Sequence, residues 1–234
     1  MAILSIVIPT YNEARTIEKI IRGAAASTRT MGMTEEIIVV DDASIDETET
    51  IVKGITDIHI AYHRMPVNRG KGAALKKGFE EATGDIVVIQ DADLEYDPGD
   101  YPKLIEPIQL AKADVVYGTR FKGQYQRVLY FWHSLGNTVL TLISNVFTNL
   151  NLSDMETGYK VFRKEVIKSI VPRLRSERFG IEPEITARVA HGRWRIYEVP
   201  INYFGRTYEE GKKIGWWDGV KAIFAIIYFN IFDR

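Results

Sequence analysis

The sequence predicts an α/β fold in which a mostly parallel, twisted sheet is flanked by helices. In the first half of the chain, short apolar runs alternate with amphipathic stretches, which is the pattern of parallel strands joined by helices. The runs are nearly continuous Val and Ile, as expected for strands buried on both faces. Polar or glycine-rich turns follow these runs, and ligands of such sheets bind where the strands end. The turns are therefore the candidate site.

Each element can be placed along the chain. Strands are predicted at Leu4–Ile8, Glu36–Val40, Ile58–Tyr62, Asp85–Ile89 and Asp114–Tyr117, with helices between them at about 13–28, 46–54, 70–82 and 100–111. The second half predicts a long apolar, mostly helical stretch over 127–150 that Gly136 interrupts, then a strand and helix around 158–171, a helix near 182–191 and a strand near 194–199. We expect one domain over 1–213 and a C-terminal amphipathic segment over 214–234, packed on the domain or on a membrane surface.

Composition limits the class of protein. The chain has 234 residues, of which 46% are hydrophobic and 26% charged, so it can bury a core and is not disordered. It contains no cysteine, which excludes disulfides and thiolate metal sites. Residues 3–8 read as a first strand and not as a signal peptide, so a cytoplasmic location is expected.

The net charge of −1 hides an asymmetry between the two halves. Residues 1–117 carry 12 Lys and Arg against 20 Asp and Glu, a net charge of −8, whereas residues 118–234 carry 18 against 11, a net charge of +7. The second half is therefore expected to meet an acidic partner, such as phosphate groups or a membrane surface. A chance distribution over a solvated surface is the alternative.

Two carboxylates, Asp91 and Asp93, directly follow a buried strand. Alternate side chains of an extended segment share a face, so both can bind one cation. Hard cations such as Mg²⁺ prefer oxygen ligands and complete their shell with water and substrate phosphates. Glu95 lies close enough in sequence to contribute. An acidic turn on a solvated surface is the alternative.

Two further turns end predicted strands. The carboxylates of Asp41 and Asp42 could bind a nucleobase or ribose, or one of the polar residues here could cap the following helix. The turn Gly70-Lys71-Gly72 lacks the third glycine of a dinucleotide fingerprint and follows the third strand instead of the first, so we reject that motif. It could still bind phosphate through backbone N–H groups, with Lys71 adding charge.

Taken together, these segments resemble the family-2 glycosyltransferases, especially the dolichyl- or polyprenyl-phosphate mannose and glucose synthases. The matching stretches are residues 7–13 (VIPTYNE), 41–48 (DDASIDET), 68–75 (NRGKGAAL), 91–98 (DADLEYDP) and 118–121 (GTRF). Each stretch is a weak signal alone, but five in this order and spacing are specific. The resemblance covers roughly residues 3–213.

The resemblance implies the glycosyltransferase A-type fold and inverting, metal-dependent transfer of a hexose from a nucleoside-diphosphate sugar, with GDP-mannose and UDP-glucose as the leading donors. It implies that the nucleoside is held by Pro9, Tyr11, Glu13, Asp41 and Asp42. It also implies that Asp91 and Asp93 hold Mg²⁺ or Mn²⁺ against the diphosphate, which makes Asp93 a catalytic residue, with Glu95 as a further metal contact. Many relatives have Gln at the position of Glu95.

The second half extends the resemblance. Residues 154–162 (DMETGYKVF) resemble the family's second acidic motif, and residues 198–206 with Lys212 resemble its closing loop. By this resemblance, Arg206 acts in catalysis and clamps donor or acceptor phosphate together with Lys212, while the acceptor side contains Arg120, Arg127 and Ser134. The processive synthases carry a Gln-X-X-Arg-Trp signature, and its Gln is missing before Arg193-Trp194. A polymerising enzyme is therefore not expected.

Transfer displaces the nucleoside diphosphate from the anomeric carbon, and a metal with cationic side chains stabilises that leaving group. A polyprenyl-phosphate acceptor is already anionic and needs no strong base. For a hydroxyl acceptor, Asp154 is the candidate base. A helix cap near Ser153 is the alternative role of Asp154.

Two apolar segments suggest a membrane surface. Ala222–Phe232 is too short for a transmembrane helix, and Val128–Leu150 contains several polar residues. Both have the pattern of interfacial helices, which predicts a peripheral protein on the cytoplasmic membrane face. The expected anchors are Trp132, Trp216, Trp217, Lys221 and Tyr228. Core packing or a dimer interface, and so a homo-oligomer, is the alternative.

Other functions remain as hypotheses. The chain could transfer sugar to a glycan, protein or small-molecule hydroxyl, or could bind nucleotide-sugars without catalysis. The presence of Asp91, Asp93 and Arg206 speaks against a non-catalytic protein. A sugar-nucleotide pyrophosphorylase would carry a Gly-rich loop ending in Arg where residues 9–13 stand. No nucleic-acid partner is expected.

Overall fold

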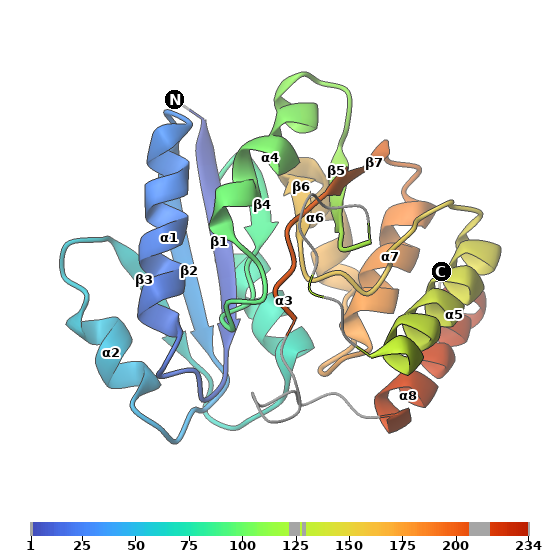
Figure 1. Cartoon of the computed structure of the whole chain (residues 1–234), viewed down its shortest axis with the longest axis horizontal. Coiled ribbons are helices and arrows are strands. Elements are labelled where there is room, and N and C mark those ends of the chain that lie inside the picture. Colours follow the sequence, from blue (N-terminus) through green and yellow to red (C-terminus); the bar gives the residue numbers. More distant parts are fainter. Residues whose placement is uncertain (1, 122–126, 128–129, 206–215, 234) are drawn as a thin grey trace.

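The Val- and Ile-rich runs of the first half form the centre of one seven-stranded sheet, as the computed structural model shows (Figure 1). The structure describes residues 2–121, 127, 130–205 and 216–233. Along the sheet the strand order is β3-β2-β1-β4-β6-β5-β7. The strands are β1 (Ile3–Thr10), β2 (Thr34–Asp41), β3 (Ile60–Arg64), β4 (Ile86–Ile89), β5 (Val115–Thr119), β6 (Lys160–Arg163) and β7 (Ile196–Pro200).

The strand pairings confirm the mostly parallel sheet. β1 pairs in parallel with β2 and β4, β2 with β3, and β5 with β7. Only β6, among the described strands, runs antiparallel to its neighbours β4 and β5. The start of β6 therefore lies at the edge where the parallel strands end, since Lys160 pairs with Tyr117 near the end of β5.

Helices cover both faces of the sheet and divide the core in two. Side chains alternate along β1, so Ile6 and Ile8 pack with α1, α2 and α4, whereas Val7 packs with α3, α6 and α7. The helices are α1 (Ile17–Thr30), α2 (Thr48–Gly54), α3 (Lys71–Glu81), η1 (Pro98–Asp100), α4 (Tyr101–Gln109), α5 (Phe131–Thr148), α6 (Lys164–Ile170), η2 (Val171–Arg173), α7 (Ile181–His191), α8 (Trp216–Ile227) and η3 (Tyr228–Phe232).

Most predicted elements are found within a few residues of their predicted bounds, and three differences concern α1, β3 and α5. The first helix begins at Ile17 and not near residue 13, because residues 12–14 donate backbone hydrogen bonds to side chains of the next loop. β3 lies two residues later than predicted. Gly136 does not interrupt α5, because it is exposed and the helix backbone continues through it.

Two helices, α5 and α8, form an outer layer that packs on α7 and on each other (Figure 1). The buried guanidinium of Arg188 on α7 holds the C-terminal segment that follows α8. It donates to Asp233 at 2.8 Å and to Glu184 at 3.1 Å, and it lies 5.3 Å from the ring of Phe229. The C-terminal segment is thus anchored by a buried charge as well as by packing.

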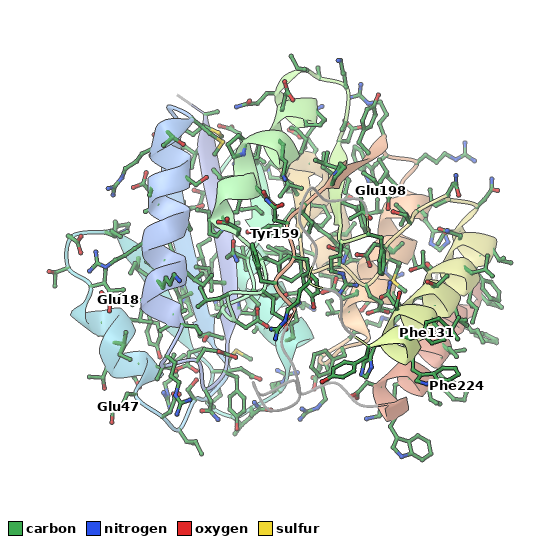
Figure 2. All side chains as sticks on the ribbon, in the orientation of Figure 1. Glu18, Glu47, Phe131, Tyr159, Glu198 and Phe224 are labelled. Carbon is green, nitrogen blue, oxygen red and sulfur yellow. The ribbon has the colours of Figure 1, made fainter. Side chains whose placement is uncertain are left out.

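Several apolar side chains of α5 are exposed, whereas Leu140, Ile143 and Phe147 are half-buried. Its buried residues are the polar Thr141 and Ser144, whereas Trp132 is 76% exposed. On α8, Phe224 is 69% exposed and lies near Phe131 of α5 on the same side of the molecule (Figure 2). These side chains are not packed in the core, whereas Ala222, Ile226 and Phe229 of the C-terminal segment are buried, as the core-packing alternative predicts. None of the helices in the described part of the chain is long and apolar enough to cross a membrane.

Candidate active site

The loops after β1 and β2 meet at one edge of the sheet and are tied to each other. Asn12, whose φ of 56° is left-handed, donates its backbone N–H to Ser44 Oγ at 2.9 Å, and its side-chain oxygen accepts from Ile45 N at 2.9 Å. These bonds leave the neighbouring Tyr11 exposed at the edge, while Pro9 is buried at the end of β1. Glu13 is half-buried and accepts from the hydroxyl of Thr16 at 3.0 Å.

Both carboxylates at the end of β2 are buried and hold the loops around them. Asp41 accepts from Tyr62 Oη at 2.6 Å and from Ser44 N at 2.8 Å. Burial and then this carboxylate raise the pKa of Tyr62, so its hydroxyl stays protonated and donates. Asp42 accepts from the backbone N–H groups of Arg69 and Gly70 at 2.8 and 2.6 Å. Neither of these two residues caps α2, which begins at Thr48. Asp46, a polar residue of the same turn, instead accepts from the first backbone N–H of this helix, Thr48 N, at 3.0 Å.

The Gly70-Lys71-Gly72 turn is not a phosphate cradle. A Cβ on Gly72 would lie 2.1 Å from the carbonyl oxygen of Ser176, and Ala73 N already donates to Glu177 O at 2.9 Å. The glycines are needed because the backbone of residues 176–178 packs against the start of α3. The predicted backbone site is therefore wrong.

The side chain of Lys71 instead begins a chain of buried charges. Its Nζ lies 2.8 Å from Asp91 Oδ1 and 3.0 Å from Glu182 Oε1. Glu182 also pairs with Lys160, whose side chain is fully buried. Burial opposes the charge of Lys71, but Asp91 and Glu182 outweigh it and raise its pKa. Asp91 is thus held in place by a lysine from a different strand-end turn.

Sequence reasoning missed Lys160 and Glu182. A signal was present, because Lys160 opens the otherwise apolar run Lys160-Val161-Phe162 directly after an acidic motif. A buried lysine needs a carboxylate partner. Nothing local to the sequence identifies that partner as Glu182, which comes from α7, 22 residues away.

The predicted set of three metal ligands is not assembled. Among the residues that the structure describes, no three Asp, Glu or His side chains lie close enough to hold a metal ion. Asp91 pairs with Lys71, and Glu95 accepts from Tyr203 Oη at 3.0 Å. Asp93 is half-buried on the turn after β4, where its Oδ1 accepts from Glu95 N at 3.2 Å.

The turn still fits a hard cation of the kind that keeps water and substrate phosphates as most of its ligands. It offers carboxylate oxygens, and its backbone is strained between them. Leu94 has a φ of 61°, which costs about 1–2 kcal/mol for a residue other than glycine. Strain of this kind clusters at ligand sites.

Beneath the turn, a buried polar network fixes its base. Gln90 Oε1 accepts from Tyr101 Oη and Tyr159 Oη, both at 2.7 Å. The ring of Tyr159 lies 4.9 Å from that of Tyr96, whose hydroxyl accepts from Gly158 N at 2.8 Å. Figure 2 shows Tyr159 at the centre of the molecule. A fully satisfied network of this kind makes the turn rigid.

The segment before β6, residues 153–158, also lies at the edge of the sheet where the parallel strands end. A Cβ on Gly158 would lie 2.3 Å from Asp91 Oδ2, so only glycine lets the backbone pass this close. Glu198 on β7 accepts from Ser153 N at 2.7 Å and from Asp154 N at 3.2 Å. Gly158 therefore places the middle of the second acidic motif against Asp91, and Glu198 holds the beginning of the motif against β7.

Asp154 is fully buried and bound to Arg120. Arg120 Nε and Nη2 each lie 2.7 Å from a carboxylate oxygen, and Arg120 N donates at 3.1 Å. Asn137 on α5 contacts both groups, at 3.1 and 3.2 Å. Burial would raise the pKa of Asp154, but the charge and hydrogen bonds of Arg120 lower it. No helix begins at Asp154, so capping is the wrong explanation for this residue too.

The remaining predicted residues lie on the same side as Arg120 or outside the described part of the chain. Arg127 is exposed and donates to Gly205 O at 3.1 Å. Ser134 is exposed on α5, one turn before Asn137. Arg206 and Lys212 lie outside the described residues.

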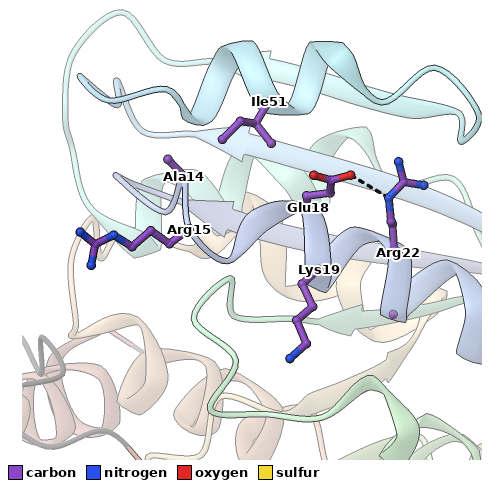
Figure 3. Close-up of a pocket in the computed structure, with 7 residues that line it drawn as sticks. Ala14, Arg15, Glu18, Lys19, Arg22 and Ile51 are labelled. Carbon is purple, nitrogen blue, oxygen red and sulfur yellow. Dashed lines mark hydrogen bonds and ion pairs between the residues drawn. The ribbon is translucent and has the colours of Figure 1, made fainter.

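A separate surface depression of about 630 Å³ lies between α1 and α2 (Figure 3). Its lining includes Arg15, Lys19 and the ion pair of Glu18 with Arg22. None of the predicted site residues lines it, so it is distinct from the strand-end site.

Comparison with known proteins identifies the family. A family profile described as "Glycosyl transferase family 2" matches residues 5–171. The chain belongs to this family. The profile includes the strand-end motifs and the segment before β6, so the predicted resemblance and the glycosyltransferase class are confirmed.

Two curated members of the family align over most of this chain. A dolichol-phosphate mannosyltransferase of Pyrococcus furiosus is 30% identical over 216 residues, which cover 91% of this chain and 59% of the relative. Glycosyltransferase AglD of Haloferax volcanii is 26% identical over 204 residues, which cover 86% of this chain and 33% of the relative. The chain thus spans about three fifths and one third of these relatives.

Solved structures confirm the glycosyltransferase A-type fold. A glucosyl-3-phosphoglycerate synthase of Mycobacterium tuberculosis, in complex with Mn²⁺, UDP and phosphoglyceric acid, superposes with a TM-score of 0.74 at 21% identity. The match covers 98% of this chain and 79% of the synthase. Another structure of the same enzyme contains Mg²⁺ and UDP.

Proposed function

We propose that this family-2 enzyme transfers a hexose, mannose or glucose, with inversion from a nucleoside-diphosphate sugar to a polyprenyl phosphate. One observation carries the proposal. The strand-end carboxylates lie at one edge of the sheet, and the Arg120–Asp154 pair at that edge is joined through Asn137 to a helix with outward-facing apolar residues. A phosphate carried on a lipid suits a cationic site next to an apolar surface. The name of the Pyrococcus furiosus relative supports the same acceptor.

On the donor side, we propose that the loops after β1 and β2 bind the nucleoside through Pro9, Tyr11, Glu13, Asp41 and Asp42. Tyr11 is exposed at the edge and can stack on a base. Both carboxylates of the Asp pair are already bonded within the protein, so their contribution is chiefly to shape the loops.

We propose that Asp93, together with Asp91, holds Mg²⁺ or Mn²⁺ against the donor diphosphate. When bound, the metal supplies positive charge that stabilises the departing nucleoside diphosphate. The complexes of the Mycobacterium tuberculosis synthase with these metals and UDP support this assignment. Lys71 positions Asp91 and lies close enough to the turn to interact with a phosphate oxygen.

On the acceptor side, we propose that Arg120, Arg127 and Ser134 face the lipid phosphate, while Arg206 and Lys212 clamp phosphate from the closing loop. Asp154 then positions Arg120. A carboxylate with a lowered pKa whose oxygens are both bonded is poorly suited to be a base. A transferase acting on a hydroxyl is the alternative, and it needs a different proton acceptor.

We further propose that residues 1–213 carry the chemistry and that α5 and the segment 214–234 bind the cytoplasmic face of a membrane. The exposed aromatic side chains of α5 and α8 support this proposal. The chain should float with liposomes that contain anionic lipid, and a Trp132→Ser, Phe224→Ser double variant should remain in the lower fraction. A parent chain that stays unbound but elutes as a dimer would show that this surface is a subunit interface instead.

The proposed reaction is tested by transfer of labelled sugar from GDP-mannose or UDP-glucose to polyprenyl phosphate in the presence of Mn²⁺. Asp93→Asn should abolish turnover while circular dichroism stays unchanged. Asp57→Asn, at an exposed ion pair with Arg22 away from the site, is the matched control and should retain full turnover. Full parental activity in EDTA would refute the metal assignment.

A further inference from the structure

One carboxylate oxygen near the site has no hydrogen-bond partner among the residues that the structure describes. Glu156 lies two residues after Asp154, and its Oε1 is buried without a hydrogen bond from any described group. Leaving a buried polar atom unsatisfied costs about 1–3 kcal/mol. A native protein rarely keeps such an atom without a use for it.

Charged groups surround Glu156 from several elements, but each cation is already paired. Lys160 on β6 binds Glu182 on α7, and Arg120 after β5 binds Asp154. Burial and then the charge of Glu182 raise the pKa of Glu156 to about 7, with Asp154 adding to the rise and Lys160 and Arg120 opposing it. The carboxyl therefore exchanges its proton near neutral pH.

The position of Glu156 connects the two halves of the site. Gly158 brings its segment against Asp91, where the donor diphosphate is proposed to bind. Asp154 brings the other end of the segment to Arg120, on the proposed acceptor side. Glu156 stands between these two residues of the segment in sequence and is close enough to Arg120 and Asp154 for both to act on its charge.

Resting on the proposed function, we infer that Glu156, rather than Asp154, is the catalytic residue that accepts the proton of the acceptor's nucleophilic oxygen. The O–H proton passes to Glu156 Oε1, and the oxygen forms a bond to the anomeric carbon. The bond from that carbon to the donor phosphate oxygen breaks, and its electron pair leaves with the nucleoside diphosphate. A phosphate monoester has its second pKa near 6, so part of a polyprenyl-phosphate pool carries this proton at neutral pH.

The decisive experiment compares the parent chain with Glu156→Gln, which keeps the size of the side chain but cannot accept a proton in this way. Sugar transfer to polyprenyl phosphate and slow hydrolysis of the same donor by water are measured from pH 5.5 to 8.5 with Mn²⁺. Water does not titrate in this pH range. A hydrolysis rate that rises with pH therefore indicates deprotonation of the catalytic base. Exposed Glu106→Gln on α4 is the matched control.

We expect hydrolysis by the parent to rise with a midpoint near pH 7, and Glu156→Gln to lose both this rise and about 10²-fold or more in rate. Glu106→Gln should behave as the parent. Transfer and hydrolysis by Glu156→Gln within threefold of the parent would overturn the inference. So would a loss of rate that leaves the rise with pH in place, because that result indicates a structural role. A parent chain that turns over no nucleotide-sugar would instead refute the proposed function, and the inference with it.

Discussion

The substitution Glu156→Gln should stabilise the fold at alkaline pH and leave its stability unchanged in acid. Burial raises the pKa of this carboxyl from the ordinary 4.5 to about 7. At 1.36 kcal/mol for each pH unit, ionising it in the folded protein costs about 3 kcal/mol. The folded state binds the proton more tightly than the unfolded chain, so this cost develops as the pH rises from about 4.5 to 7 and is complete above that range.

The amide of Gln is neutral at every pH and avoids this cost. For a protein of this size, 1 kcal/mol corresponds to about 2–4 °C in Tm, so the variant should melt about 6–12 °C above the parent at pH 8. Near pH 4 the two proteins should have the same Tm, because the side chains of Glu156 and of its Gln replacement are then both uncharged and nearly equal in shape.

Differential scanning calorimetry of both proteins at the two pH values, in EDTA, measures this difference. Glu106→Gln, on the exposed side of α4, controls for the loss of a carboxylate in general and should show no pH-dependent gain. A Tm difference between Glu156→Gln and the parent that is the same at pH 4 and pH 8 would refute the reasoning.

Three further predictions concern two ion pairs and one close backbone contact. Asp154→Asn removes the carboxylate partner of the partly buried guanidinium of Arg120 and should lower the free energy of unfolding in urea by about 3 kcal/mol; an unchanged midpoint of unfolding would contradict the importance of this ion pair. The hydrogen bonds from Arg195 hold the pKa of Asp114 well below its usual range, so its stabilisation is present at pH 7 and is lost in acid. Asp114→Asn should therefore lower Tm at pH 7, and its difference from the parent should narrow from pH 5 toward pH 2. Gly158→Ala should lower kcat/KM at least about tenfold in a folded protein, because its methyl group would displace the nearby carboxylate; parental kcat/KM would show that this contact is unimportant.

The sequence predicted the parts of the fold that depend on local pattern. The Val and Ile runs identified β1, β2 and β4, because strands buried on both faces need uninterrupted apolar residues. The spacing of Ile17, Ile20, Ile21 and Ala24 similarly marks the buried face of α1. The direction of β6 had no such signal, since a four-residue strand with only two apolar residues, Val161 and Phe162, has the same pattern in either pairing.

The site was predicted as a set of segments but not as a set of contacts. Asp91 and Lys71 were both identified as site residues, yet only the fold brings them to 2.8 Å and so removes Lys71 from a phosphate cradle. Glu156 belonged to a quoted motif, but its role depends on which neighbouring cations are already paired. That information lies in β5, β6 and α7 together, and no single segment contains it.

Because β6 runs antiparallel to its neighbours, the proposed donor-side and acceptor-side residues lie on different connections of the fold and can change independently. The donor-side turns follow parallel strands, and their lengths are constrained by the helices that must return to the sheet. The proposed acceptor-side residue Arg120 and its partner Asp154 come from the chain between β5 and β6, which enters the sheet again at Lys160. Insertions or replacements in this stretch would change the proposed acceptor side without disturbing the register of β1, β2 and β4. On the proposed assignment of the two sides, exchange of this one connection is enough to change the acceptor while the donor-side turns stay the same.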